Sequence, residues 1–184
     1  MALHPSLVCP PPGLDYSTYL GGSGEEVAYG VAVDNNGFVY VAGFTDSVDF
    51  PVANAHQSGK HSGRDAFILK LNPNNNVLVY STYFGGNGLD EAHSIVIDDS
   101  GNATVLGYTD STDFPLSAAP LQGDTGGRDL FLARFDSNGA LLYSTYLGGS
   151  DTDEGSNLVL DDFGNVYITG RTFSSDFPVL EGNS

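Results

Sequence analysis

The sequence is short of positive charge and holds a single cysteine. Six lysine and arginine residues stand against 23 aspartate and glutamate residues, which gives a formal net charge of −17 at pH 7. A surface of this sign repels phosphate backbones and anionic lipid headgroups, so we expect no nucleic-acid partner. Because Cys9 has no second cysteine to pair with, no intrachain disulfide can form. Stability must therefore come from packing or from association between chains.

Long apolar runs and tryptophan are also missing. No segment approaches the roughly 18 apolar residues of a membrane-spanning helix, so membrane insertion is not expected. Residues 1–12 lack the basic start and the apolar run of a signal peptide, so an export signal would have to lie outside this sequence. Glycine is plentiful, with 24 residues, together with 9 prolines, 11 phenylalanines and 10 tyrosines. This composition favours short strands joined by tight turns and predicts an all-β fold.

A threefold internal repeat organises the chain. The block YSTYLGG at residues 16–22 returns at residues 80–86 and 143–149, with periods of 64 and 63 residues. An apolar run ending in Asp-x-x-Gly and an Asp-Phe-Pro block keep the same spacing, and a fourth block, GRDAFIL at residues 63–69, recurs once, at residues 127–133. Each unit thus contains four strand-like runs bounded by turn residues. Four strands per repeat predict the antiparallel blades of a β-propeller.

Taken together, these blocks resemble the bacterial seven-bladed β-propeller repeat family (SBBP repeats). The shared pattern is the tyrosine-rich strand with its Gly-Gly, the apolar run ending in aspartate, and the Ser-x-Asp-Phe-Pro segment, and it covers residues 14–179. The resemblance implies a secreted or surface-displayed propeller with a binding or structural role. It supplies no catalytic residues.

We predict one β-propeller repeat domain over residues 1–184. Apolar runs such as residues 95–97 should form the innermost strands. Known rings have roughly four to eight blades, so the chain is a fragment or assembles with other chains. Pairing of end strands predicts a homo-oligomer, or a filament if the contact does not close. The predicted units are outer strands completing a blade at 1–22, blades at 28–86 and 92–149, and a partial blade at 155–184.

Carboxylates gather after the third Gly-Gly block and in the turn that follows the next apolar run. Calcium prefers carboxylate oxygens, so either of these two places is a candidate metal site. The competing interpretation is structural, because Asp-x-x-Gly forms a hairpin turn and charged loop residues are stable in water. The spacing also differs from the EF-hand loop, and a calcium ion needs about six to eight oxygens. The candidate ligands are Asp151, Asp153, Glu154, Asp161 and Asp162.

The remaining motifs favour structural roles. The recurring pairs Arg64-Asp65 and Arg128-Asp129 should make the same scaffold contact in each blade. The tyrosines of the repeated block either stack on sugar rings or pack in the core. The four histidines lack zinc-ligand spacing, and no nucleophile elbow or phosphate loop is present.

Three functional hypotheses follow. The first is a non-catalytic scaffold, extracellular or at the cell surface, with a structural, self-assembling or adhesive role. The alternative is a carbohydrate- or protein-binding module, with Ca²⁺ as its only candidate cofactor. A polysaccharide-acting enzyme is least favoured, because paired carboxylates carry little information in so acidic a chain. We therefore expect no enzymatic activity.

Overall fold

The described part of the chain is made of β-strands joined by turns and loops. The computed structural model describes residue 13 and residues 16–179, and within them there are ten strands and no helix. No helix in this part is therefore long and apolar enough to cross a membrane. The predicted all-β class is confirmed.

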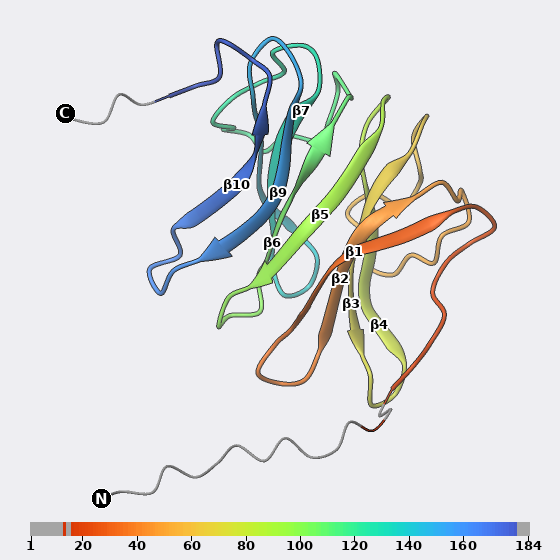
Figure 1. Ribbon diagram of the computed structural model, residues 1–184. Coiled ribbons are helices and arrows are strands. Elements are labelled where there is room, and N and C mark those ends of the chain that lie inside the picture. The colour runs from red at the N-terminus through yellow and green to blue at the C-terminus, as the bar shows by residue number, and fades with distance from the viewer. Residues whose placement is uncertain (1–12, 14–15, 180–184) are drawn as a thin grey trace, which may run out of the picture.

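The strands form three antiparallel sheets (Figure 1). The first sheet has the order β1 (Glu26–Val33), β2 (Val39–Thr45), β3 (Asp65–Asn72) and β4 (Val77–Phe84). The second has the order β5 (Asp90–Ile97), β6 (Ala103–Thr109), β7 (Asp129–Phe135) and β8 (Leu141–Leu147). The third pairs β9 (Asp153–Leu160) with β10 (Val166–Thr172). The first two sheets confirm the predicted four-stranded blades.

A tight turn joins the first two strands of each sheet. In the first sheet Asp34 Oδ1 accepts hydrogen bonds from the backbone N–H groups of Asn36 (2.9 Å) and Phe38 (3.0 Å). Gly37 then takes a positive φ of 82°, which residues with a Cβ avoid. Asp98 and Asp161 accept the equivalent bonds in the other two turns. The repeated Asp-x-x-Gly block is therefore a turn in every repeat.

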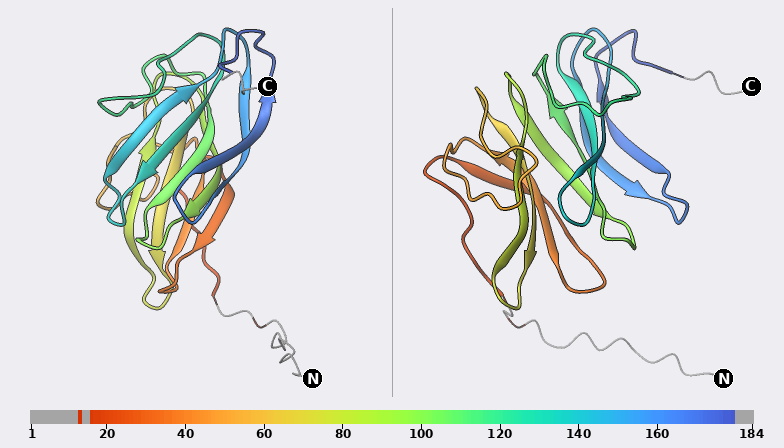
Figure 2. Two further views of the ribbon diagram at one scale, coloured as in Figure 1. Left: turned by 90° about the vertical axis from the view of Figure 1, so that its left-hand side faces the viewer. Right: turned by 180° about the vertical axis from the view of Figure 1, so that it is seen from behind.

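The sheets stack face to face, and the core lies between them (Figure 2). Strand β5 contacts β1, β2 and β3 of the sheet before it, and β9 contacts β5, β6 and β7. The first strands of successive sheets therefore contact one another, which places them at the inner edge of the stack. The main core joins side chains of the first two sheets, among them Tyr40, Ile68, Phe84, Val105, Phe131 and Phe135.

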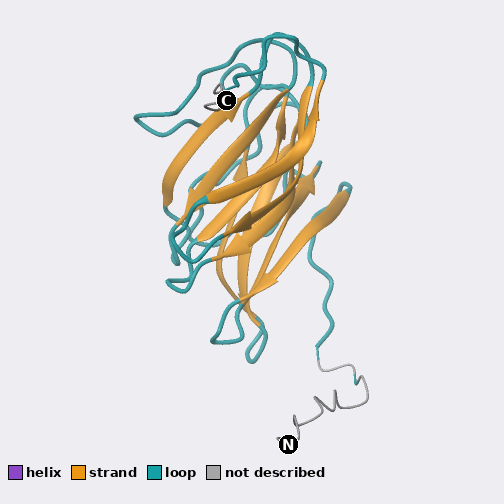
Figure 3. Ribbon diagram, turned by 60° about the vertical axis from the view of Figure 1, so that its left-hand side comes forward, coloured by secondary structure: helices purple, strands orange, loops and turns teal. Residues whose placement is uncertain are grey.

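A long loop covers the outer edge of each complete sheet (Figure 3). The loop between β2 and β3 forms two isolated β-bridges with β4, one between Ala53 and Ser81 and one between Gln57 and Tyr83. In the second sheet, Ser117 N–H bonds to the carbonyl of Ser144 on β8 (3.4 Å). These loops shield edges that would otherwise be open to pairing.

The N-terminal segment differs from the sequence expectation. An outer strand was expected within residues 1–22, yet residues 16–22 are not paired as a strand. Such a strand needs a neighbour, and within the described part of the chain no sheet precedes β1 to supply one. Residues 1–12, which were expected to contribute a further strand, lie outside the described residues.

Candidate functional site

A buried aspartate lies at each interface between two neighbouring sheets, here called a seam. Asp90, at the start of β5, accepts hydrogen bonds from the backbone N–H of Gly86 and the hydroxyl of Ser111, both at 2.8 Å, and from the hydroxyl of Thr109. Asp153, at the start of β9, accepts the same bonds from Gly149 (2.7 Å) and Ser174 (2.8 Å). In both seams the carboxylate ties the Gly-Gly connection to the first two strands of the next sheet.

A second buried carboxylate lies beside Asp90. An atom placed as Cβ on Gly85 would lie 3.0 Å from the carboxyl carbon of Asp65 and 3.1 Å from that of Asp90. Only glycine leaves room for both groups. Oδ1 of Asp65 is buried without a hydrogen-bond partner. Asp129 and Asp153 crowd Gly148 in the same way in the next seam.

Burial governs the protonation of these carboxyl groups. It raises the pKa of Asp90 to about 6, and the nearby Asp65 charge adds to the rise, while hydrogen bonds from Thr109, Gly86 and Ser111 oppose it. Burial also raises the pKa values of Asp65 and Asp129. Asp65 and Asp90 in the first seam, and Asp129 in the second, therefore hold their protons more tightly than ordinary aspartates.

Two glutamines that the sequence analysis missed complete the seams. Gln57 donates to Asp65 Oδ2 (2.7 Å) and accepts from the N–H of Gly85 (3.1 Å). Gln122 accepts from the N–H of Gly148 (3.3 Å) and donates to its carbonyl (2.7 Å). A motif search misses them because Gln122 lies one position further along its repeat than Gln57 does in the repeat before. The signal was composition, since they are the only glutamines in the sequence.

The recurring arginines also cross the seams. Arg64 contacts Glu91 of the second sheet (2.7 Å) and Asp46 of its own sheet (3.3 Å), and its guanidinium lies 3.6 Å from the Phe44 ring centre. Arg128 repeats the arrangement with Glu154 (2.9 Å), Asp110 (2.7 Å) and the ring of Tyr108 (4.3 Å). Each arginine makes the same scaffold contact in its own blade.

Glu91 is the most strongly stabilised carboxylate of these seams. Burial alone would raise its pKa, but hydrogen bonds from His93 and Arg64 outweigh that effect and lower the pKa to about 2. Glu91 therefore stays ionised and holds Arg64 across the seam at 2.7 Å.

The five candidate calcium ligands do not come together. Asp151, Asp153 and Glu154 lie at the start of β9, and Asp161 and Asp162 lie in the turn after its end. An eight-residue strand separates the groups by about 25 Å. Glu154 is paired with Arg128 and Arg171, and Asp161 caps its own turn. Among the residues that the structure describes, no three His, Cys, Asp or Glu side chains are arranged to hold a metal ion.

The two acidic groups are therefore separate candidate places, with β9 between them. Calcium binding by either group stays a prediction.

Three of the six tyrosines of the repeated block are core residues. Tyr80, Tyr83 and Tyr146 are buried. The Tyr83 hydroxyl donates to the carbonyl of Ser47 (2.9 Å) and accepts from Phe50 N–H (2.9 Å), and Tyr146 repeats both bonds. Tyr19 is fully exposed. Tyr83 and Tyr146 hold the Asp-Phe-Pro segment of their own sheet, and the three buried rings are not available to stack on a sugar.

The two ends of the stack leave open faces. The face of β1–β4 turned away from the second sheet, here called the leading face, carries Val31, Val41 and Leu78. The face of β9–β10 turned away from the second sheet, here called the trailing face, carries Val159, Tyr167 and Arg171. Val31 is 69% exposed, whereas its repeat equivalents Ile95 and Leu158 are 5% and 2% exposed. The leading face therefore has an apolar residue at a position that a neighbouring sheet covers in the other two repeats, but no described sheet covers it here.

Stacked antiparallel sheets joined by recurring seam contacts define a propeller-type repeat protein. The family model described as "Beta-propeller repeat" (SBBP) matches residues 15–51, 79–115 and 142–178. The chain belongs to this family, as its sequence blocks predicted. No curated protein matches the chain.

Proposed function

We propose that this protein is a non-catalytic scaffold, extracellular or at the cell surface, that associates with further copies through its open faces. The observation that carries the proposal is the exposure of Val31, since the same repeat position is buried by a neighbouring sheet at Ile95 and Leu158. Covering Val31 would remove apolar surface from water, which is the main driving force of association.

The seam contacts support a structural role. Arg64, Arg128, Asp90 and Asp153 each bind groups of the same or the adjoining sheet, so the conspicuous polar residues of the repeat are used in holding blades together. Features that recur with the repeat serve the scaffold, whereas an active site needs a unique arrangement. The net charge of −17 would keep such assemblies soluble.

Charge placed on the leading face should separate the copies. We expect the native mass from light scattering to exceed one chain, and Val31→Asp to reduce it to one chain, because a buried unpaired carboxylate is costly. Val48→Asp is the matched control. Val48 is 79% exposed at a turn where the other repeats have Thr112 and Ser175, so this change should leave the mass unaltered. A single-chain mass for the unmodified protein, or no effect of Val31→Asp, would refute the proposal.

A further inference from the structure

Residues 16–20 already occupy the place of an outer strand. Their sequence, YSTYL, matches YSTYF at the end of β4. Phe84, the last residue of β4, packs on three rings of the next sheet, Phe114, Phe131 and Phe135. Leu20, its equivalent, packs on the cluster that holds the corresponding residues of the first sheet, Phe50, Phe67 and Leu71. The segment is therefore docked as a fourth strand would be, although none of the described strands pairs with it.

The connection after Leu20 is fixed as it is after a complete sheet. The N–H of Gly22 bonds to Glu26 Oε2 (3.1 Å), as Gly86 bonds to Asp90. The N–H of Ser23 bonds to Asp49 Oδ1 (2.8 Å), as Asn87 bonds to Asp113 (2.7 Å). The first seam thus has its polar contacts in place on one side.

A groove lies beside the docked segment. It has a volume of about 500 Å³, and its walls are residues 16–20 on one side and apolar residues of the leading face on the other, among them Val39, Val41, Leu69 and Leu78. Ala103 and Val105 of the second sheet are the repeat equivalents of Val39 and Val41. In the seam between the first two sheets, the first sheet covers both of these residues. The groove therefore lies where the inner strands of a preceding blade would pack.

The trailing face presents those inner strands. Tyr167 on β10 is the repeat equivalent of Tyr40, whose hydroxyl bonds to Asp34 (3.2 Å) and reaches the carbonyl of Gly101 in the next sheet (3.1 Å). The Tyr167 hydroxyl makes the matching bond to Asp161 (3.2 Å) but is exposed. A Cβ atom placed on Gly101 would lie 3.2 Å from the Tyr40 hydroxyl. A Cβ atom placed on Gly37, the repeat equivalent of Gly101, would lie in open space. The two faces are therefore complementary halves of one seam.

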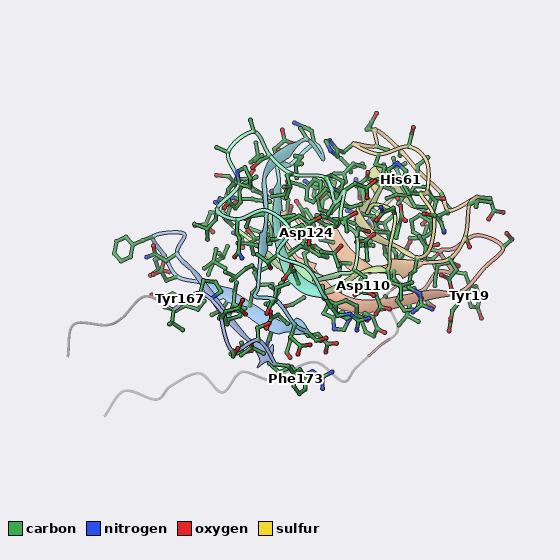
Figure 4. All side chains as sticks on the ribbon, turned by 90° about the horizontal axis from the view of Figure 1, so that it is seen from above. Tyr19, His61, Asp110, Asp124, Tyr167 and Phe173 are labelled. Atoms are coloured by element: carbon green, nitrogen blue, oxygen red, sulfur yellow. The ribbon has the colours of Figure 1, made fainter. Side chains whose placement is uncertain are left out.

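The halves cannot meet within one chain, because Tyr19 and Tyr167 lie on opposite sides of the molecule (Figure 4). We propose that β9–β10 of one copy enters the groove of a second copy and supplies the first two strands of a blade shared between the two chains, with the second copy's residues 16–20 in the place of the fourth strand. This inference rests on the proposed function and specifies its geometry. The contact is head to tail, so it generates a closed ring or a fibre.

Cross-linking between turns tests this geometry. Turns of neighbouring sheets line one groove in the structure, with Asn36 and Ser100 on its two sides. Asn36, Ser100 and Phe163 are equivalent turn residues in the three repeats. In the proposed contact, Phe163 of one copy should therefore face Asn36 of the next copy, as Asn36 faces Ser100 within one chain. In a Cys9→Ser background, chains with Asn36→Cys are mixed with chains with Phe163→Cys and treated with a short bismaleimide. We expect covalent dimers in the mixture at a rate close to that of the intrachain reaction in an Asn36→Cys/Ser100→Cys control.

Each variant alone should give only background dimers. Equal dimer formation by one variant alone would show a face-to-itself contact and overturn the inference while leaving the scaffold proposal intact. A multimer that dissociates in the Val31→Asp variant but gives no cross-linked dimer in the mixture would also overturn the inference and leave the scaffold proposal intact. A monomeric native protein would overturn both. In addition, Tyr167→Phe should weaken association about three- to tenfold, because one interchain hydrogen bond to Gly37 is lost.

Discussion

Replacing Phe84 with alanine is expected to lower the free energy of unfolding by about 3–5 kcal/mol, the usual cost of emptying a buried aromatic site. The Phe84 ring lies 4.8 Å from Phe114, 5.1 Å from Phe135 and 6.0 Å from Phe131, all in the next sheet. Its removal leaves a cavity in the middle of the seam, which rigid sheets on both sides cannot close. Urea unfolding followed by tyrosine fluorescence measures the change.

Two matched variants show whether the seam itself is responsible. Phe84→Leu should cost far less, about 1 kcal/mol, because the repeat uses leucine at the equivalent positions Leu20 and Leu147. Leu20→Ala should also cost less than Phe84→Ala, since Leu20 is only partly buried. A loss below about 1 kcal/mol for Phe84→Ala would show that the sheets are not packed as one core.

The repeat made the fold predictable from sequence. Blocks that return after 64 and 63 residues predict a recurring local structure, so the strand number and the turn type of the two complete sheets follow from the aligned copies. The first copy of the tyrosine block, residues 16–22, differs because no described strand pairs with it. The turn at Asp34 is an example, because an aspartate bonding to nearby N–H groups is a purely local interaction. Local chemistry of this kind needs no knowledge of neighbouring blades.

The seams were harder to foresee, since burial depends on residues far away in the chain. Asp90 and Asp162 look alike in an acidic sequence, yet Asp90 is buried under the Gly-Gly connection and Asp162 is exposed. The separation of the two candidate calcium-binding groups has a related cause. The groups are close in sequence, but the extended β-strand between them places them far apart in space.

The same buried carboxylates predict an unusual dependence of stability on pH. The pKa of Asp90 is about 6 in the folded protein, against 3.8 for the ordinary side chain, so the folded state keeps its proton to higher pH than the unfolded chain. A group of this kind contributes its full stability below pH 3.8 and loses it as the pH rises through about 6. From Asp90 alone the free energy of unfolding should fall by about 3 kcal/mol over this interval. Asp65 and Asp129 act in the same direction.

Carboxyl groups with lowered pKa values do not cancel this trend. Glu91, with a pKa of about 2, changes its contribution between that value and its ordinary 4.5, largely below the interval in question. Urea unfolding at a series of pH values from about 4 to 7 therefore reports the buried aspartates. Asp90→Asn should flatten the profile, whatever it does to the absolute stability, because the titrating proton is gone.

The exposed turn residue Asp162 supplies the control, and Asp162→Asn should keep the full decline. Stability that rises from pH 4 to pH 6, or an Asp90→Asn profile parallel to the original, would mean that Asp90 is hydrated rather than sealed in the seam. A flattened profile would instead identify the seam as the place where acid strengthens the stack. The next seam would then act in the same direction through Asp129, because burial raises the pKa of that carboxyl group as well.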